Sequence, residues 1–225
     1  MKEQLRTITP DMLAPDPFHP SFIDFEKDIS AAPVSALTII AANVLVFAWE
    51  LSVGALRSTA AIVAAGADYG RLVFAGESWR LVTAMFLHAG FGHIIGNCAA
   101  LYVLGLVAEQ AWGRFGAFKI YFISGLSASM LSALLQPRPS VGASGAIFGL
   151  LGAAVVFFAR HKSSFRERDR RIGAVLLAWG AMQVLLGWTD PVIDNWNHLG
   201  GLCAGVVLGL ITPSRLFNGR ASVEP

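Results

Sequence analysis

Charged residues are scarce in this sequence. Asp, Glu, Lys and Arg make up 14% of its 225 residues, whereas 55% of the residues are hydrophobic. An ordinary soluble domain carries about a quarter charged residues. The charges also fall in short polar stretches between long apolar ones, and a bilayer core needs roughly 20 apolar residues per helical span. The composition therefore argues against an ordinary soluble domain and predicts a polytopic membrane protein.

Three other features are missing or weak. Residues 1–33 contain five prolines and scattered charges but no apolar core of the signal-peptide kind, so the first membrane helix is expected to direct targeting. The net charge of +2 is too small to indicate binding to nucleic acid. The only two cysteines, Cys98 and Cys203, lie in apolar segments. That setting favours small packing residues over a disulfide, which the sequence alone leaves open.

Long apolar runs, in contrast, are abundant. Six of them predict helices, near residues 36–56, 92–109, 117–135, 144–159, 172–188 and 198–212. The connection from Arg57 to Phe91 is rich in aromatic residues, which predicts an interfacial structure lying on the membrane. The predicted fold class is therefore an all-α bundle of six transmembrane helices. Its boundaries are a cytoplasmic N-terminal segment at 1–33, the helical domain at 34–213 and a cytoplasmic tail at 214–225.

The positions of Lys and Arg predict the orientation. If the N-terminus is cytoplasmic, 13 of the 17 basic residues lie on the cytoplasmic side, and only Arg57, Arg71, Arg80 and Arg138 lie on the outer side. Both termini are then cytoplasmic. Six spans without an added seventh suit a prokaryotic cell membrane, although placement in an organelle stays open.

Four polar residues stand at the starts of predicted spans, where they are costly unless they face the protein interior or a water-filled cavity. His93 and Asn97 open the second helix, Ser144 opens the fourth and His198 opens the sixth. In the predicted topology all three helices start on the outer side. The threading of the chain therefore predicts that these side chains meet at similar depth in a cavity open to that side. His93 and Asn97, at i and i+4, share one helix face.

Stripes of small residues predict which helices pack closely. Glycines on a single face allow two helix backbones to approach each other. The stripes are Gly145, Gly149 and Gly152 in the fourth helix, and Gly201, Gly205 and Gly209 on the face of His198 in the sixth. Tight packing of these two helices would bring the Ser144 hydroxyl within hydrogen-bond reach of the His198 imidazole.

Together these groups supply the parts of a serine hydrolase. Histidine can act as the base that activates a serine hydroxyl. The Asn97 amide, the His93 ring N–H and the Ser144 backbone N–H at a helix start could stabilise an oxyanion. Because no acidic residue lies in these spans apart from Glu109, at the far end of the second helix, a Ser–His dyad is the economical interpretation.

Four motifs, between about residues 36 and 212, resemble those of the rhomboid family. Gly142-Ala143-Ser144-Gly145 matches its GxSG motif, and His93 to Asn97 matches HxxxN. His198, Gly201 and Gly205 match HxxGxxxG, and Glu77 to Arg80 resembles the ExWR element, which includes Trp79. One departure is Asn197, which stands where alanine commonly precedes the last-helix histidine. Ala146 distinguishes the motif from the GxSxG elbow of soluble hydrolases.

The resemblance implies a rhomboid-like six-helix bundle that cleaves membrane-anchored proteins in or near a transmembrane segment, without a metal or other cofactor. It implies that Ser144 and His198 are the catalytic pair, that His93 and Asn97 stabilise the oxyanion, and that Trp79 and Arg80 are structural. The partners are then a transmembrane protein substrate and the lipid bilayer, and no nucleic acid. The sequence predicts no oligomeric state.

Two alternatives stay open. One is a catalytically impaired rhomboid-like protein that binds membrane proteins; such relatives typically lack the serine or the histidine, and both are present here. The other is a small transporter in which His93, Asn97 and His198 form an ion or proton site. Transporters often contain internal repeats, and no convincing repeat occurs in this sequence. Substitution of Ser144 by alanine separates proteolysis from both.

Overall fold

The computed structural model describes residues 23–27, 29–30, 32–190 and 193–218. Regular structure in these ranges is helical, with only two isolated β-bridges. The predicted all-α class is confirmed. The elements in chain order are α2 (Val34–Val53), η1 (Ala55–Arg57), α3 (Thr59–Ala65), α4 (Gly70–Val73), α5 (Arg80–Thr83), α6 (Phe91–Leu135), α7 (Ser144–Arg160), η2 (Lys162–Ser164), α8 (Glu167–Thr189), α9 (Asn195–Ile211) and α10 (Arg215–Asn218).

A helix occupies each of the six predicted places, but the limits differ. The first helix ends at Val53 because Gly54 takes a left-handed conformation, with φ 71°, and caps it. The fifth predicted helix, α8, starts at Glu167 instead of residue 172, and the sixth, α9, starts at Asn195 instead of residue 198. In both, polar residues extend the helix before its apolar run. Within the described ranges, four helices are long and apolar enough to cross a membrane if α6 is counted once, and α7 is a shorter apolar helix. The six-span count stays a prediction.

The second and third predicted helices are joined into α6, which is broken at a single residue. Gly113 has φ 73° and ψ 175°, a conformation outside the helical region. Side chains with a Cβ rarely adopt a positive φ, so the glycine permits the chain to change direction there without a loop. The sequence predicted a loop between residues 109 and 117. In the structure the helix continues through this region, apart from the break at Gly113.

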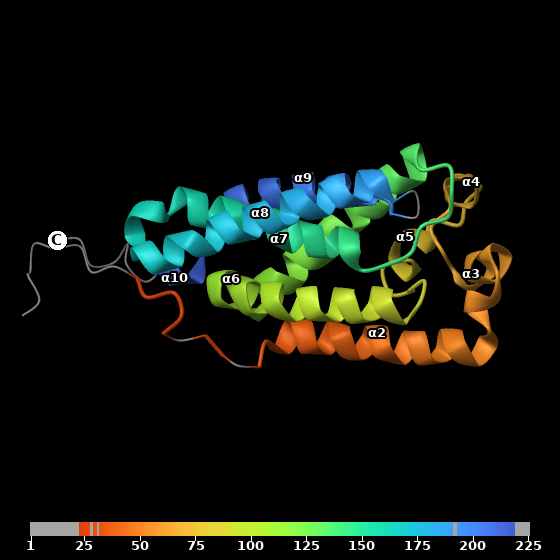
Figure 1. Cartoon of the computed structure of the whole chain (residues 1–225), viewed down its shortest axis with the longest axis horizontal. Coiled ribbons are helices and arrows are strands. Elements are labelled where there is room, and N and C mark those ends of the chain that lie inside the picture. The colour runs from red at the N-terminus through yellow and green to blue at the C-terminus, as the bar shows by residue number, and fades with distance from the viewer. Residues whose placement is uncertain (1–22, 28, 31, 191–192, 219–225) are drawn as a thin grey trace, which may run out of the picture.

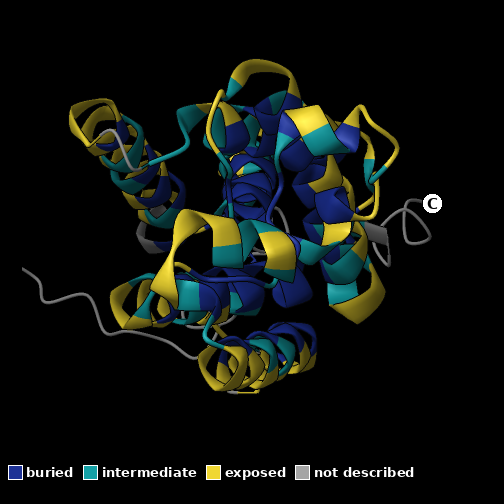
Figure 2. Cartoon of the chain, turned by 90° about the vertical axis from the view of Figure 1, so that its right-hand side faces the viewer, coloured by how far each residue is buried: buried dark blue, intermediate teal, exposed yellow. Residues whose placement is uncertain are grey.

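The central helix of the bundle is α7, which contacts α6, α8 and α9. Most of its side chains are buried, whereas α2 and α8 lie at the periphery and expose many apolar side chains (Figures 1 and 2). The helices α6, α7 and α9 all start at the end of the bundle where α3, α4 and α5 lie (Figure 1). The loops and helix starts at this end hold the four predicted polar residues.

The connection between α2 and α6 consists of η1, α3, α4 and α5. Arg80 is 5% exposed and holds it together. Its guanidinium donates to the carbonyl oxygens of Val63 (2.5 Å) and Ala67 (3.1 Å), pairs with Glu77 at 2.7 Å and lies 4.5 Å from the ring centre of Trp79. These contacts fit the predicted structural role of Trp79 and Arg80. The predicted position of this connection on the membrane surface stays a prediction.

At the opposite end, part of the predicted N-terminal segment packs into the bundle. Phe25 is fully buried and contacts the rings of Phe157, Phe158 and Phe165. Its backbone N–H donates to the Asp169 carboxylate at 2.9 Å. Arg215, at the start of the predicted tail, likewise donates to the carbonyl oxygen of Gln110. Residues 1–22 and 219–225, which make up most of the two predicted terminal segments, lie outside the described residues.

Candidate active site

Ser144 is the first residue of α7 and follows a glycine that the backbone requires. Gly142 has φ 130°, and its N–H donates to the carbonyl oxygen of Ala84 at 2.8 Å. A Cβ at residue 142 would come within 2.8 Å of His93 Nε2. The first glycine of the GxSG motif thus supplies both a turn and room for the His93 ring. At a helix start the Ser144 N–H has no intrahelical partner.

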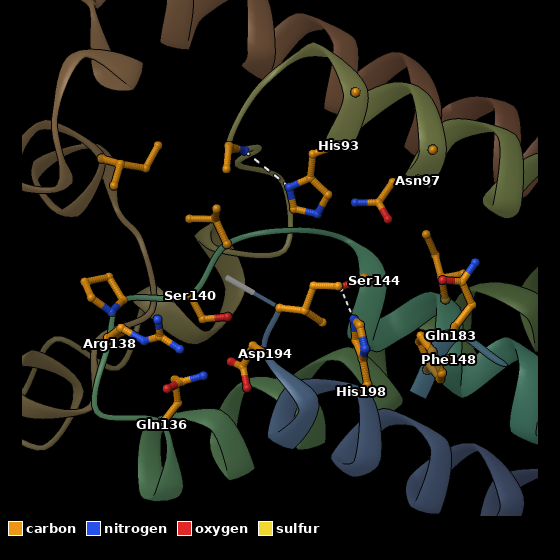
Figure 3. Close-up of a pocket in the computed structure, with 18 of the residues that line it drawn as sticks. His93, Asn97, Gln136, Arg138, Ser140, Ser144, Phe148, Gln183, Asp194 and His198 are labelled. Carbon is orange, nitrogen blue, oxygen red and sulfur yellow. Dashed lines mark hydrogen bonds between the residues drawn. The ribbon is translucent and has the colours of Figure 1, made fainter. Parts of the chain in front are cut away.

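His198 lies in the first turn of α9, and its Nε2 is 3.0 Å from Ser144 Oγ (Figure 3). Its ring stacks on Phe148, with centroids 4.2 Å apart and an interplanar angle of 16°. The buried Nδ1 has no hydrogen-bond partner among the described residues. The ring orientation therefore comes from packing and from the helix that carries it, not from a third side chain on Nδ1.

Glycines bring the two helices together. A Cβ at Gly201 would overlap the carbonyl oxygen of Gly145, and one at Gly205 would overlap that of Gly149. The α7 and α9 backbones are therefore in direct contact along the two glycine stripes. This close approach explains how Ser144 and His198, which are 54 residues apart in sequence, come within hydrogen-bond distance.

His93 and Asn97 lie on the first turns of α6 and point toward Ser144 (Figure 3). The backbone N–H of Ala89 donates to His93 Nδ1 at 3.3 Å, so in the neutral ring the proton is on Nε2, the nitrogen close to Gly142. Asn97 Nδ2 is buried without a partner among the described residues. Two side-chain N–H donors, of His93 and Asn97, thus lie beside the serine.

The four side chains open into a cavity of about 760 Å³. Its wall is made by the starts of α6, α7 and α9, by the segment before α7, by α3 and by one face of α8. Arg138 and Asp194 are its two charged lining residues in the described part of the chain. They lie on the side of Ser144 opposite Gln183 and Phe148 (Figure 3).

Asn197, the departure from the family pattern, lies against Gly145. A Cβ added at residue 145 would overlap Asn197 Oδ1 and come within 2.5 Å of the Ala128 Cβ. Asn197 is 8% exposed, so its amide fills the space beside the residue that follows the serine. The fold accommodates this larger side chain without separating Ser144 from His198.

Sequence reasoning missed Asp194. Its Oδ1 accepts the backbone N–H of Asn197 at 3.0 Å and caps α9, while Oδ2 accepts the Ser132 hydroxyl of α6 at 2.5 Å. An aspartate just before a helix is a recognised N-cap signal. The sequence predicted that this helix begins near residue 198, whereas α9 begins at Asn195, directly after Asp194. The cap was therefore not recognised. Phe148 was also missed, although it lies one turn after Ser144 on the same face of α7.

Two buried titratable groups lie in the loops behind the site. Burial, reinforced by the nearby Asp194 carboxylate and opposed by Arg80, raises the pKa of Asp68 to about 7. Burial, together with the neighbouring His93, lowers the pKa of His88 to about 4, although the Phe86 carbonyl opposes this. His88 also donates its backbone N–H to the buried Glu50 carboxylate at 3.1 Å. Asp68 and Ser140 pair through their backbones, so Asp68 supports the segment that leads to Ser144.

Comparison with known proteins gives consistent matches. The model of the rhomboid domain matches residues 75–215. The chain is 35% identical over 173 residues to Rhomboid protease GluP of Bacillus subtilis (strain 168), a match that covers 77% of this chain and 34% of that protein. It is 39% identical over 145 residues to RHOMBOID-like protein 6, mitochondrial, of Arabidopsis thaliana, covering 64% of this chain and 47% of that protein. The chain therefore spans less than half of the length of these relatives.

Proposed function

Because this chain belongs to the rhomboid family, we propose that it is an intramembrane serine endopeptidase that cleaves transmembrane proteins with a Ser144–His198 dyad. The observation that carries the proposal is the 3.0 Å contact between Ser144 Oγ and His198 Nε2 inside a cavity. That distance lies in the range for proton transfer between a nucleophile and its base. The protein is an integral membrane protein, as its family and its apolar helices indicate.

Each step has a group to perform it. His198 Nε2 takes the Ser144 proton as Oγ attacks the scissile carbonyl carbon. The oxyanion that forms accepts hydrogen bonds from Asn97 Nδ2, His93 Nε2–H and the Ser144 backbone N–H. His198 then gives the proton to the leaving amine, and water, activated by the same histidine, hydrolyses the acyl-enzyme. We assign a dyad and not a triad, because no acidic side chain among the described residues bonds to His198 Nδ1.

The charge distribution supports an orientation. With the basic residues mainly on the cytoplasmic side, the starts of α6, α7 and α9 face the outer side. The cavity then opens to that side and admits the water that hydrolysis consumes. The substrate enters laterally from the lipid, between α8 and the neighbouring wall, because α7 and α9 are too close together to admit a chain.

The test is labelling of the purified protein in detergent with a fluorophosphonate, which reacts only with an activated serine. We expect the wild type to be labelled, and Ser144→Ala and His198→Ala to be unlabelled. Thermal unfolding of each variant shows that the fold is retained. A folded wild type that is not labelled would contradict the proposal, and a rhomboid-like binding protein would then be the better interpretation, with Asn197→Ala the first variant to examine for restored labelling.

A further inference from the structure

Gln183 is a polar side chain of α8 that faces the cavity. The span Asp169–Thr189 of α8 is long and apolar enough to cross a membrane. Gln183 lines the cavity together with Trp179, one turn earlier, and with Phe148 of α7 (Figure 3). It is half-buried, and its amide makes no hydrogen bond with any residue that the structure describes. A side chain with two donors and an acceptor oxygen therefore stands unused at membrane depth.

Such a group calls for an explanation. An unpaired amide in the hydrocarbon region is unfavourable, and polar groups persist there mainly where they face a cavity and act on something within it. No hydrogen bond from the Gln183 amide to α7 or α9 supports the fold in the described residues. Moreover, the cavity wall that α8 contributes consists of Trp179 and Gln183 alone among these residues. Gln183 is thus the one side chain of that wall that can both donate and accept hydrogen bonds, because the Trp179 indole can only donate.

The substrate has the complementary need. A peptide bond inside a helix is shielded by the turns around it, so a transmembrane substrate must unwind next to Ser144 before it can be attacked. Unwinding frees backbone N–H and C=O groups at a depth where no lipid can satisfy them. On one side of the cavity, Ser140 and Gln136 are polar lining residues. On the side from which the substrate would enter, Gln183 is the α8 side chain that can satisfy both N–H and C=O groups, whereas Trp179 can only donate.

We propose that Gln183 is a substrate-binding residue whose amide hydrogen-bonds the unwound backbone of the transmembrane substrate as it passes α8 toward Ser144. This inference rests on the proposed function. It assigns Gln183 a role that depends on a membrane-spanning substrate and not on the chemistry of the serine. A small probe that reacts with Ser144 directly should therefore not require it.

The experiment uses Gln183→Met, which keeps the length and apolar stem of the side chain but removes its donors and acceptor, and Gln183→Leu as a second apolar replacement. The matched control is Met182→Leu, at the adjacent position that is 48% exposed on the outside of α8. Three quantities are measured: cleavage in proteoliposomes of a fluorescent single-span protein that the wild type cleaves, the rate of fluorophosphonate labelling, and the unfolding temperature.

We expect both Gln183 variants to lose about 10-fold in kcat/KM for the single-span protein, the effect of one lost hydrogen bond. Labelling should proceed at the wild-type rate, and the unfolding temperature should be unchanged or higher. Met182→Leu should match the wild type throughout. Unchanged cleavage would overturn the inference while wild-type labelling still supports the protease. Slower labelling or a lower unfolding temperature would overturn it in favour of a structural role, and an unlabelled wild type would remove it together with the proposed function.

Discussion

The Ser132 hydroxyl donates to the Asp194 carboxylate at 2.5 Å and so ties the end of α6 to the start of α9. The other carboxylate oxygen accepts the backbone N–H of Asn197 and caps the helix. His198 lies in the same turn, with its backbone N–H 3.2 Å from the carbonyl oxygen of Asp194. Asp194 therefore helps to fix the base in the proposed dyad through the helix that carries it, without touching the imidazole Nδ1.

Removal of this cap should weaken both the fold and the dyad. Asp194→Ala loses an N-cap worth about 1 kcal/mol and a partly buried hydrogen bond from Ser132 worth about 1 kcal/mol, so we expect the free energy of unfolding to fall by about 2 kcal/mol. Fluorophosphonate labelling should slow, because His198 is held less firmly. Asp194→Asn, which can still cap the helix, should recover most of the loss.

The matched control is Ser127→Ala, because the Ser127 hydroxyl makes only an exposed, local bond to the carbonyl oxygen of Ile123. Unfolding followed by circular dichroism in detergent gives the stabilities. Equal labelling rates in the wild type and Asp194→Ala would show that the cap does not position the base.

The sequence predicted the helices and the meeting of Ser144 with His198 because both follow from patterns that a chain displays locally: apolar runs, basic flanks and glycine spacing. It could not predict the bond between Ser132 and Asp194, because that bond joins two helices whose relative rotation no local pattern specifies. The break at Gly113 was missed for a related reason. Many glycines occur in these helices, and only tertiary packing determines which of them takes a positive φ.

Because the α7 and α9 backbones are in contact, replacement of Gly201 at this contact should destabilise the protein. In Gly201→Ala the new methyl group would meet the Gly145 carbonyl oxygen, which is backbone and cannot rotate away. We expect the helices to separate, the free energy of unfolding to fall by about 1–3 kcal/mol and fluorophosphonate labelling to be largely lost.

Gly96→Ala provides the opposite case, since a Cβ there meets no atom within 4 Å. Alanine favours a helix over glycine by up to about 1 kcal/mol, so this variant should be as stable as the wild type or more so. Unfolding measured side by side should give the two substitutions opposite signs. A similar, small effect for both would mean that α7 and α9 do not touch as closely as described.

Phe25 should anchor the N-terminal segment to the bundle. Its ring lies 5.0 Å from that of Phe158 and 5.8 Å from that of Phe165, centroid to centroid, and it is fully buried. Phe25→Ala removes these contacts and should cost about 3–5 kcal/mol of unfolding free energy. Lys27→Ala, at an exposed position in the same segment, should change it by less than about 0.5 kcal/mol. Equal stabilities for the two variants would show that the segment is not part of the folded unit.

The buried Asp68 predicts a dependence of stability on pH. Burial raises the pKa of its carboxyl to about 7, whereas an aspartate in an unfolded chain titrates near 4. Between these values the folded protein binds more protons than the unfolded one, so its contribution to stability falls as pH rises from about 4 to about 7 and is constant above. Asp68→Asn mimics the protonated form, and its stability relative to the wild type should therefore grow across this window.

His88 serves as a control of opposite sign. Burial lowers the pKa of its ring to about 4, so between pH 4 and about 6.5 the unfolded chain binds the extra proton and the His88 contribution to stability rises with pH. The stability of His88→Gln relative to the wild type should therefore decrease with pH over that range. Any change in packing caused by the substitution adds a difference that does not depend on pH. Denaturation of all three proteins at half-unit steps of pH gives the two slopes. A flat difference for Asp68→Asn would mean that Asp68 is charged throughout, and that Arg80 outweighs both burial and the Asp194 carboxylate.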